Sequence, residues 1–439
     1  MSKKKISWVT PDYFLDVDIP IVPNLLDEYD IIWIILFPWR NNRYKEEDLS
    51  KYAKKYNNLS IFFVHSKYFR YDPRTFFVYR KILKLIERSQ ANLIYFNIVL
   101  DNPLLYSLFK WLPKDKCVIT AHDGSIKSIM GSVTKSMFRK CYPNCKYVNM
   151  FSESQAALFK INYPGPEIFV IPLALKDFGV PNVTLRNDCV SFVSFGTMHA
   201  EKNIQLIIEA ANQLFEEGVR NFKVSINGVW RISDTPNQLI RYPEIFEIRN
   251  TLIPNNDIPN LFCSNHYAIY AYKEMSQSGA VKVAFNYYTP VIVSDLPGFK
   301  DEVEEDINGY FFKSENIDSL KDVMRKCIDK TTEDYNALVG RMRDNIDRKY
   351  SVKALLPKYK AMFSKVLNDE EIDSMINNTD KLINEGIDKI LEGDFTINPK
   401  VIDGTNVSCS FCEYRDICYL REKDITYINR EEDKDGEDV

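Results

Sequence analysis

Short apolar and β-branched runs alternate with segments of helical periodicity along most of the chain. One series of strand-like runs fills the first part of the sequence: Ile6–Val9, Ile31–Leu36, Ile61–Val64, Leu93–Phe96, Val118–Thr120, Tyr147–Phe151 and Phe169–Pro172. A second series follows: Val190–Phe195, Phe222–Asn227, Phe246–Arg249, Ala268–Tyr272, Val291–Ser294 and Tyr310–Phe312. Apolar strands separated by helices are typical of a parallel sheet covered on both faces. The pattern therefore predicts an α/β protein with two Rossmann-like lobes.

The two series are separated by a linker with turn-forming residues. Asp177, Gly179, Pro181 and Asn182 cluster within residues 176–188. We therefore expect a first lobe over residues 1–180, a second over 181–367, and an extension over 368–439. The 439 residues suit this division, because domains usually hold about 100–200 residues.

Composition narrows the class of protein. The formal charge of −4 provides no global attraction to nucleic acid or to acidic membranes. The longest apolar stretch, Ile31–Pro38, is shorter than the about 20 residues of a membrane-spanning helix, and MSKKK is not followed by a signal-type segment. We expect a cytoplasmic protein, with peripheral contact at the inner face of the membrane as an alternative.

The turn after the run Val190–Phe195 is a candidate phosphate site. In SFVSFGTMHAEKN a strand breaks at Gly196, and helical periodicity begins at Ile204. The start of a helix offers unpaired N–H groups and the positive end of a dipole, so Lys202 and the backbone together would bind a phosphate. The candidate contacts are Gly196, Thr197, Lys202 and Asn203.

A second candidate phosphate loop lies in residues 270–313. Gln277, Ser278 and Gly279 precede a short helix, and Gly279 lets the backbone approach an anion closely. Pro290, a buried-type strand, the loop with Pro297-Gly298 and the turn Asn308-Gly309 follow in that order.

Together these two stretches resemble the C-terminal half of a retaining family 4 glycosyltransferase with the GT-B fold. That family has a G-R-x-x-x-E-K-N turn, a Glu-rich loop followed by A-x-x-x-G-x-P-V-I, a G-G-x-x-E loop and an N-G turn. The resemblance extends over roughly residues 5–365. It implies two facing Rossmann-like domains, a UDP- or GDP-linked sugar donor, a glycan or lipid-linked acceptor, and transfer without a cofactor.

The resemblance also implies roles for individual residues. Lys202 would stabilise the leaving diphosphate, Glu274 would lie near the donor sugar, and His122, directly after a strand, would match the family's active-site histidine. His65, His199 and His266 are expected to be structural. The segment 151–155 and Asp301 are supporting matches.

Some positions depart from the family pattern. Thr197 stands where the family has an arginine, so one cation is absent from the turn. When the sequences are aligned through Pro290, the second glutamate of the family's pair falls at Val283, or at Lys282 with a slip of one residue.

The expected acceptor side lies in the first lobe. Residues 10–24 lack the family's glycines and contain Asp16 and Asp18 instead. Basic and aromatic residues gather nearby and could rest on a membrane surface, although an ordinary solvated face is equally consistent with them. These residues are Trp39, Arg40, Arg43, Tyr44, Lys45, Lys67, Tyr68, Phe69, Arg70, Tyr71 and Arg74.

The extension has a different character. A helix-period segment over 372–391 leads to Cys409, Cys412 and Cys418 in the spacing C-x2-C-x5-C, which resembles the cysteine-rich end of RecB-type iron–sulfur nucleases. Three thiolates suit an iron–sulfur cluster or zinc but need a fourth ligand, and no candidate lies nearby in the sequence. Cys141 and Cys145 in the first lobe can serve only if the lobes fold back onto the tail. A metal-free remnant or an open partner site is the alternative.

Three hypotheses follow. The first is a retaining glycosyltransferase. The second is a GT-B nucleotide-sugar-binding protein that has lost catalysis, as suggested by Thr197 and the broken glutamate pair. The third is a protein that associates with nucleic acid through its cysteine tail, although nucleic acid is not the expected partner.

Overall fold

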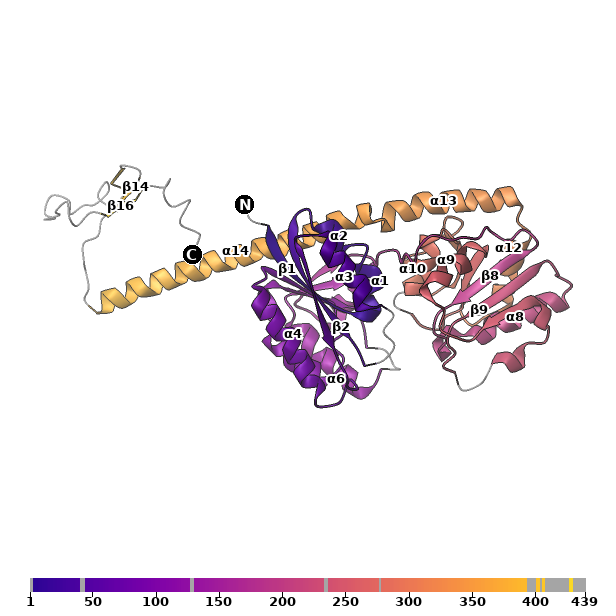
Figure 1. Ribbon diagram of the computed structural model, residues 1–439, viewed down its shortest axis with the longest axis horizontal. Coiled ribbons are helices and arrows are strands. Elements are labelled where there is room, and N and C mark those ends of the chain that lie inside the picture. Colours follow the sequence, from indigo (N-terminus) through magenta and orange to yellow (C-terminus); the bar gives the residue numbers. More distant parts are fainter. Residues whose placement is uncertain are drawn as a thin grey trace. The chain divides into compact units, whose positions relative to one another are not determined.

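The computed structural model describes residues 3–39, 44–126, 130–232, 236–275 and 278–392, together with strand residues 400–402, 405–406 and 426–428. The chain forms two compact units, one ending at Asn368 and the other beginning at Asp369. The first unit contains two parallel sheets, each covered by helices (Figure 1). These sheets confirm the predicted pair of Rossmann-like lobes.

The first sheet has the strand order β3-β2-β1-β4-β5-β6-β7, and all its strands are parallel. The strand order reverses between β1 and β4, and in open parallel sheets ligands usually bind outside the carboxyl ends of the strands at such a reversal. The strands are β1 (Lys4–Pro11), β2 (Tyr29–Phe37), β3 (Leu59–His65), β4 (Leu93–Phe96), β5 (Cys117–Ala121), β6 (Tyr147–Met150) and β7 (Glu167–Val170).

Alternating side chains of these strands face two separate cores. Trp8 faces one core and its neighbour Val9 the other, as expected for a strand buried on both sides. The core around Trp8 is covered by α1 (Leu15–Asp18), α2 (Val22–Leu25) and α3 (Glu46–Lys55). The core around Val9 is covered by α4 (Thr75–Ser89), α5 (Pro103–Trp111), α6 (Ser132–Cys141) and α7 (Glu153–Asn162).

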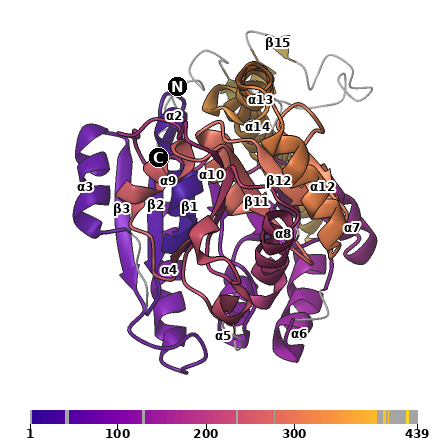
Figure 2. The same ribbon diagram turned by 90° about the vertical axis from the view of Figure 1, so that its right-hand side faces the viewer.

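The second sheet has the order β10-β9-β8-β11-β12-β13, again entirely parallel. Its neighbouring strands β11 and β12 are labelled in Figure 2. Its strands are β8 (Val190–Phe195), β9 (Phe222–Asn227), β10 (Phe246–Arg249), β11 (Tyr267–Tyr270), β12 (Val291–Ser294) and β13 (Gly309–Phe312). One core lies against α8 (Ile204–Glu216) and α12 (Ile317–Ile328). The other lies against α9 (Ile258–Cys263), α10 (Gly279–Asn286), α11 (Pro297–Lys300) and α13 (Thr332–Tyr350).

After α13 the chain returns to the first lobe. The beginning of α14 (Val352–Leu391) places Leu355, Tyr359 and Phe363 in the core around Trp8. The rings of Tyr359 and Phe363 lie 5.8 and 6.2 Å from that of Trp8. The expected boundary of the second lobe at residue 367 therefore lies too late in the chain, because the apolar face of this helix is buried on the first sheet.

The remaining elements are short. The 3-10 helices are Asp12–Phe14, Lys114–Lys116, Tyr142–Asn144, Ala200–Lys202, Pro236–Leu239, Pro243–Ile245 and Asn255–Asp257. In the second unit, β14 (Lys400–Ile402) pairs with β15 (Thr405–Asn406) and β16 (Thr426–Ile428). Among the helices of the described ranges, none combines the length and apolar character that a bilayer crossing requires.

Candidate functional site

The turn after β8 is a tight backbone crossing. Gly196 has a φ of +130°, a conformation that favours glycine, and its N–H donates to the carbonyl oxygen of Asn227 at 3.0 Å. A Cβ atom on Gly228 would lie 1.8 Å from the Gly196 carbonyl oxygen, so that position has no room for a side chain. The sequence predicted this turn. Thr197, the expected site of a missing cation, is exposed on it.

Lys202 lies just before α8, in the 3-10 helix Ala200–Lys202, and α8 begins at Ile204, where the helical periodicity begins. Asn203 follows it with a φ of +49°, which turns the chain into α8. The Lys202 ammonium donates a hydrogen bond to the Tyr272 hydroxyl and lies 3.8 Å from the centre of that ring. Lys202 pairs with no carboxylate among the described residues, so its positive charge is not neutralised there.

The second predicted loop adjoins the first. The Lys273 N–H donates to the carbonyl oxygen of Glu201 at 2.9 Å, which joins the end of β11 to the turn carrying Lys202. Ser278 caps α10, because its hydroxyl accepts from the Val281 N–H at 3.3 Å. Glu274 is exposed on this loop. Gln277 lies outside the described residues.

The first lobe contributes His122, directly after β5 as expected. Its half-buried ring lies edge-on to the rings of Phe14 and Phe151, at 4.7 and 5.2 Å. The loop continues to Gly124, where a Cβ atom would lie 2.0 Å from the carbonyl oxygen of Gln155 in α7. The backbone of α7 therefore fixes the course of the loop that carries His122.

A buried carboxyl group lies beneath this edge of the first sheet. Asp18 accepts hydrogen bonds from the Trp8 indole at 3.0 Å, the Thr10 hydroxyl at 2.6 Å and the Asn97 amide at 3.4 Å. Burial raises the pKa of Asp18 to about 7, although these hydrogen bonds act in the opposite direction. Asn97 also accepts from the Thr120 hydroxyl at 2.6 Å, two residues before His122. Asp16 and Asp18 were noted in the sequence, but their burial was not predicted.

One polar contact joins the two lobes, and a second joins the linker to the first lobe. The Asp301 carboxylate accepts from the backbone N–H and hydroxyl of Ser154, at 3.1 and 2.5 Å, and so lies at the first turn of α7. The Lys176 ammonium donates to Asp16 at 2.8 Å. Asp301 and the segment 151–155, which the sequence identified separately, are thus brought together.

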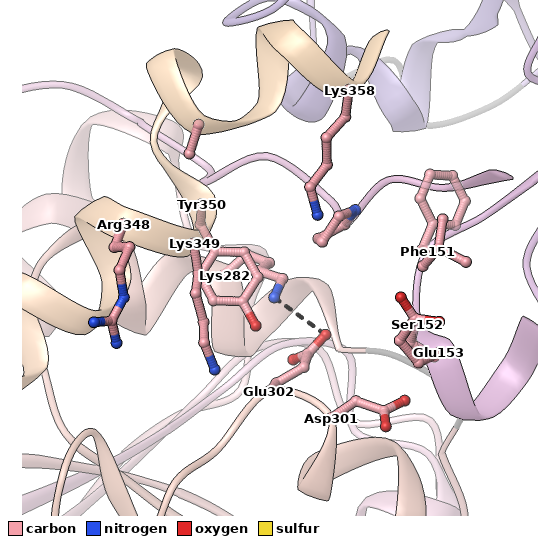
Figure 3. Close-up of a pocket in the computed structure, with 13 residues that line it drawn as sticks. Phe151, Ser152, Glu153, Lys282, Asp301, Glu302, Arg348, Lys349, Tyr350 and Lys358 are labelled. Atoms are coloured by element: carbon pink, nitrogen blue, oxygen red, sulfur yellow. Dashed lines mark ion pairs between the residues drawn. The ribbon is translucent and has the colours of Figure 1, made fainter. Parts of the chain in front are cut away.

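A pocket of about 310 Å³ lies between the lobes near the Asp301 contact (Figure 3). First-lobe residues 151–153 form one wall. The other is formed by Lys282 of α10, by Asp301 and Glu302 directly after α11, and by residues 348–350 at the end of α13. Lys358 extends from α14 toward the cavity (Figure 3). The pocket therefore lies where three parts of the chain meet.

Lys282, a candidate position for the family's second glutamate, carries the opposite charge and forms a buried ion pair. Its ammonium lies 3.2 Å from the Glu302 carboxylate and 3.6 Å from the centre of the Tyr350 ring. Burial lowers the pKa of Lys282 and raises that of Glu302. Val283 is buried in the core of the second lobe. Neither position supplies a glutamate to bind ribose, as the sequence indicated.

Part of the basic and aromatic cluster lines a pocket of about 320 Å³ at the carboxyl ends of β2 and β3. Trp39 and Phe69 are about half exposed, and their ring centres are 6.5 Å apart. The Arg74 guanidinium lies 4.1 Å from the centre of the Tyr68 ring. Arg40 and Arg43 lie outside the described residues. Membrane contact through this cluster stays a prediction.

The remaining histidines make local contacts. His65 pairs with Glu46 and stacks on Phe37, with ring centres 5.1 Å apart. The Nδ1 atom of His266 lies 3.2 Å from the Ser191 N–H, and burial lowers the pKa of His266. His199 is exposed beside the turn after β8.

The predicted metal ligands Cys409, Cys412 and Cys418 lie outside the described residues. Cys141 and Cys145 are buried in the first lobe, and burial raises the pKa of both thiols, which disfavours the thiolate form that metals require. No group of three or more candidate ligand residues forms a metal site within the part of the chain that the structure describes.

The second lobe matches a known family. Residues 182–344 match the model of the Glycosyl transferases group 1 family. No curated protein sequence matches the chain. The fold is that of a GT-B glycosyltransferase.

Solved structures of low sequence identity share this fold. A glycosyltransferase from Rickettsia africae is 18% identical with a TM-score of 0.62, covering 84% of this chain and 99% of its own. Sucrose-phosphate synthase from Thermosynechococcus elongatus is 11% identical with a TM-score of 0.63, covering 83% and 100%. The Anabaena protein HepE, solved with UDP and glucose, is 13% identical with a TM-score of 0.60, covering 82% and 100%.

Proposed function

We propose that this protein is a glycosyltransferase that moves a sugar from a UDP- or GDP-linked donor to a glycan or lipid-linked acceptor, with retention of configuration. The observation that carries the proposal is the Lys202 ammonium, which has no carboxylate partner among the described residues and lies beside the loop before α10 in the family-matched lobe. The structure of HepE with UDP and glucose supports a nucleotide-sugar donor.

In the proposed reaction the bond between the anomeric carbon and the diphosphate oxygen breaks, and the diphosphate leaves with the electron pair. The acceptor hydroxyl oxygen forms the new bond to the anomeric carbon on the same face, and its proton passes to the departing diphosphate. Lys202 and the backbone N–H group of Gly279 would stabilise the developing negative charge. His122 would hydrogen-bond a donor hydroxyl from the opposite lobe, and Glu274 would lie near the sugar. The reaction needs no cofactor, because these side chains and helix ends supply the charge stabilisation.

A donor assay tests this proposal. UDP- and GDP-sugars are supplied with or without glycan and lipid-linked acceptors, and free nucleotide diphosphate is measured. Lys202→Ala should lower kcat/KM by about tenfold or more, because it removes a cation that faces the leaving group. Lys160→Ala, which removes an exposed lysine on α7, is the matched control. Equal activity of the Lys202→Ala and parent proteins would contradict the assigned role, and NMR of the product would report its anomeric configuration.

Binding without transfer is the second candidate function. The buried pairing of Lys282 with Glu302, at a candidate position for the family's second glutamate, favours it because no carboxylate is offered to the ribose there. Nucleotide-sugar binding with no turnover on any acceptor would support this alternative. Donor-dependent product formation would exclude it.

A further inference from the structure

A lysine of the linker lies at the start of α10. Lys176 follows the first lobe, and its ammonium lies 2.7 Å from the position that a Cβ atom on Gly279 would take. The side chain is only 16% exposed. A nearly buried cation is thus held against the N-terminal residue of a helix.

This position is electrostatically unfavourable for an ammonium group without an anion. The N-terminal end of a helix carries partial positive charge, so a cation placed there is repelled. In this structure the compensating anion is Asp16 of the first lobe, whose Oδ2 atom accepts from Lys176 at 2.8 Å. The protein's own carboxylate therefore lies where a cation and a helix dipole would together attract an anion.

Only one of the two carboxylate oxygens of Asp16 has a hydrogen-bond donor within the described part of the chain. Its side chain is 7% exposed, and its Oδ1 atom has no hydrogen-bond partner among the described residues. Burying a carboxylate oxygen without a hydrogen-bond donor is unfavourable. If an anion took the place of Asp16 beside Lys176, the Asp16 carboxylate would move into water and this unfavourable burial would end.

Lys202 and Lys176 contact opposite ends of the segment between β11 and α10. Lys202 contacts Tyr272, and Lys176 adjoins Gly279 after the same segment. The Tyr270 hydroxyl donates to the carbonyl oxygen of Ala280 at 2.9 Å and fixes α10 to β11. Two ammonium groups that contact the ends of this segment would share the negative charge of a diphosphate bound there.

We propose that Lys176 is a second ligand of the donor diphosphate. Its ammonium pairs with Asp16 before the donor binds and with the diphosphate afterwards. Lys176 then provides the cation that Thr197 does not. This inference rests on the proposed function. It predicts that nucleotide diphosphate and Asp16 compete for one ammonium group.

Calorimetric titration of the full-length protein with UDP and GDP tests the exchange, with uridine and guanosine as probes that lack phosphate. Lys176→Met should weaken diphosphate binding by about tenfold or more and leave nucleoside binding unchanged. Asp16→Asn should strengthen diphosphate binding several-fold, because it removes the competing charge. Lys160→Met is the matched control. Lys176→Met alone leaves the Asp16 carboxylate buried without its partner, which could impair folding. The double variant Lys176→Met with Asp16→Asn removes both charges and avoids this problem.

The outcomes separate this inference from the proposed function. If Lys202→Ala weakens diphosphate binding but both Lys176→Met and the double variant bind like the parent, the exchange is refuted and the proposed function stands. If the parent binds neither UDP nor GDP, the proposed function fails and the inference fails with it. A loss of nucleoside binding equal to the loss of diphosphate binding would also overturn the exchange, since it would indicate a general structural defect.

Discussion

Replacing Asp18 by asparagine should change how the stability of the protein depends on pH. The Asp18 carboxyl is 2% exposed and accepts hydrogen bonds from Trp8, Thr10 and Asn97. The side-chain carbonyl of asparagine can accept the same bonds without ever ionising. The variant therefore removes the titration while keeping the shape of the group.

The magnitude follows from the raised pKa. Asp18 has a pKa of about 7 in the folded protein, against 3.8 for an unperturbed carboxyl. Because the folded-state pKa is the higher one, the stabilising contribution is complete below pH 3.8 and is lost as the pH rises toward 7. At 1.36 kcal/mol per pKa unit the total loss is about 4 kcal/mol, of which about 2.5 kcal/mol falls between pH 5 and 8.

Urea unfolding followed by tryptophan fluorescence at pH 5, 6, 7 and 8 measures this effect, since Trp8 and Trp33 both lie in the core of the first lobe. The unfolding free energy of the parent minus that of Asp18→Asn should fall by about 2.5 kcal/mol from pH 5 to pH 8. Asp115→Asn, at an exposed position of the same lobe, is the control. Parallel pH profiles for parent and Asp18→Asn would refute the reasoning.

Three further substitutions test the packing around the site. Gly124→Ala should unfold or rearrange the loop that carries His122, because the new Cβ would lie 2.0 Å from a backbone oxygen of α7; circular dichroism melting would show a lower Tm, and an unchanged Tm would contradict this. Glu302→Gln should cost about 3–5 kcal/mol in urea unfolding by leaving the buried Lys282 without its carboxylate, and adding Lys282→Met should restore part of the loss. Asp301→Ala should increase hydrogen exchange at the start of α7 by removing the acceptor of the Ser154 N–H, whereas unchanged protection there would argue against a contact in solution.

Much of the fold could be predicted because its signals are local. Continuous apolar runs indicate buried parallel strands, and the predicted run Val291–Ser294 coincides with the buried strand β12. Gly196 marked the turn after β8, because a backbone with a φ of +130° favours glycine. The return of α14 to the first lobe was missed, because an apolar helix face indicates burial but not the sheet that buries it.

Part of the candidate site could be predicted for the same reason. Lys202 and Ser278 occupy positions that a strand, a turn and a helix start define by themselves. Lys282 was recognised as a departure from the family, but its buried partner Glu302 was not. From sequence alone a charged side chain is expected to be exposed. Its burial becomes apparent only when the structure shows the opposite charge beside it.

The sequence by itself determined the alternation of strands and helices, the two lobes and the positions of the two candidate phosphate loops, since each depends on residues close together in the chain. Only the tertiary structure decided that Asp16 meets Lys176, 160 positions away, and that Asp301 meets Ser154. These pairs form because segments far apart in the sequence pack against each other. No local pattern of apolar and polar residues indicates which residues will meet.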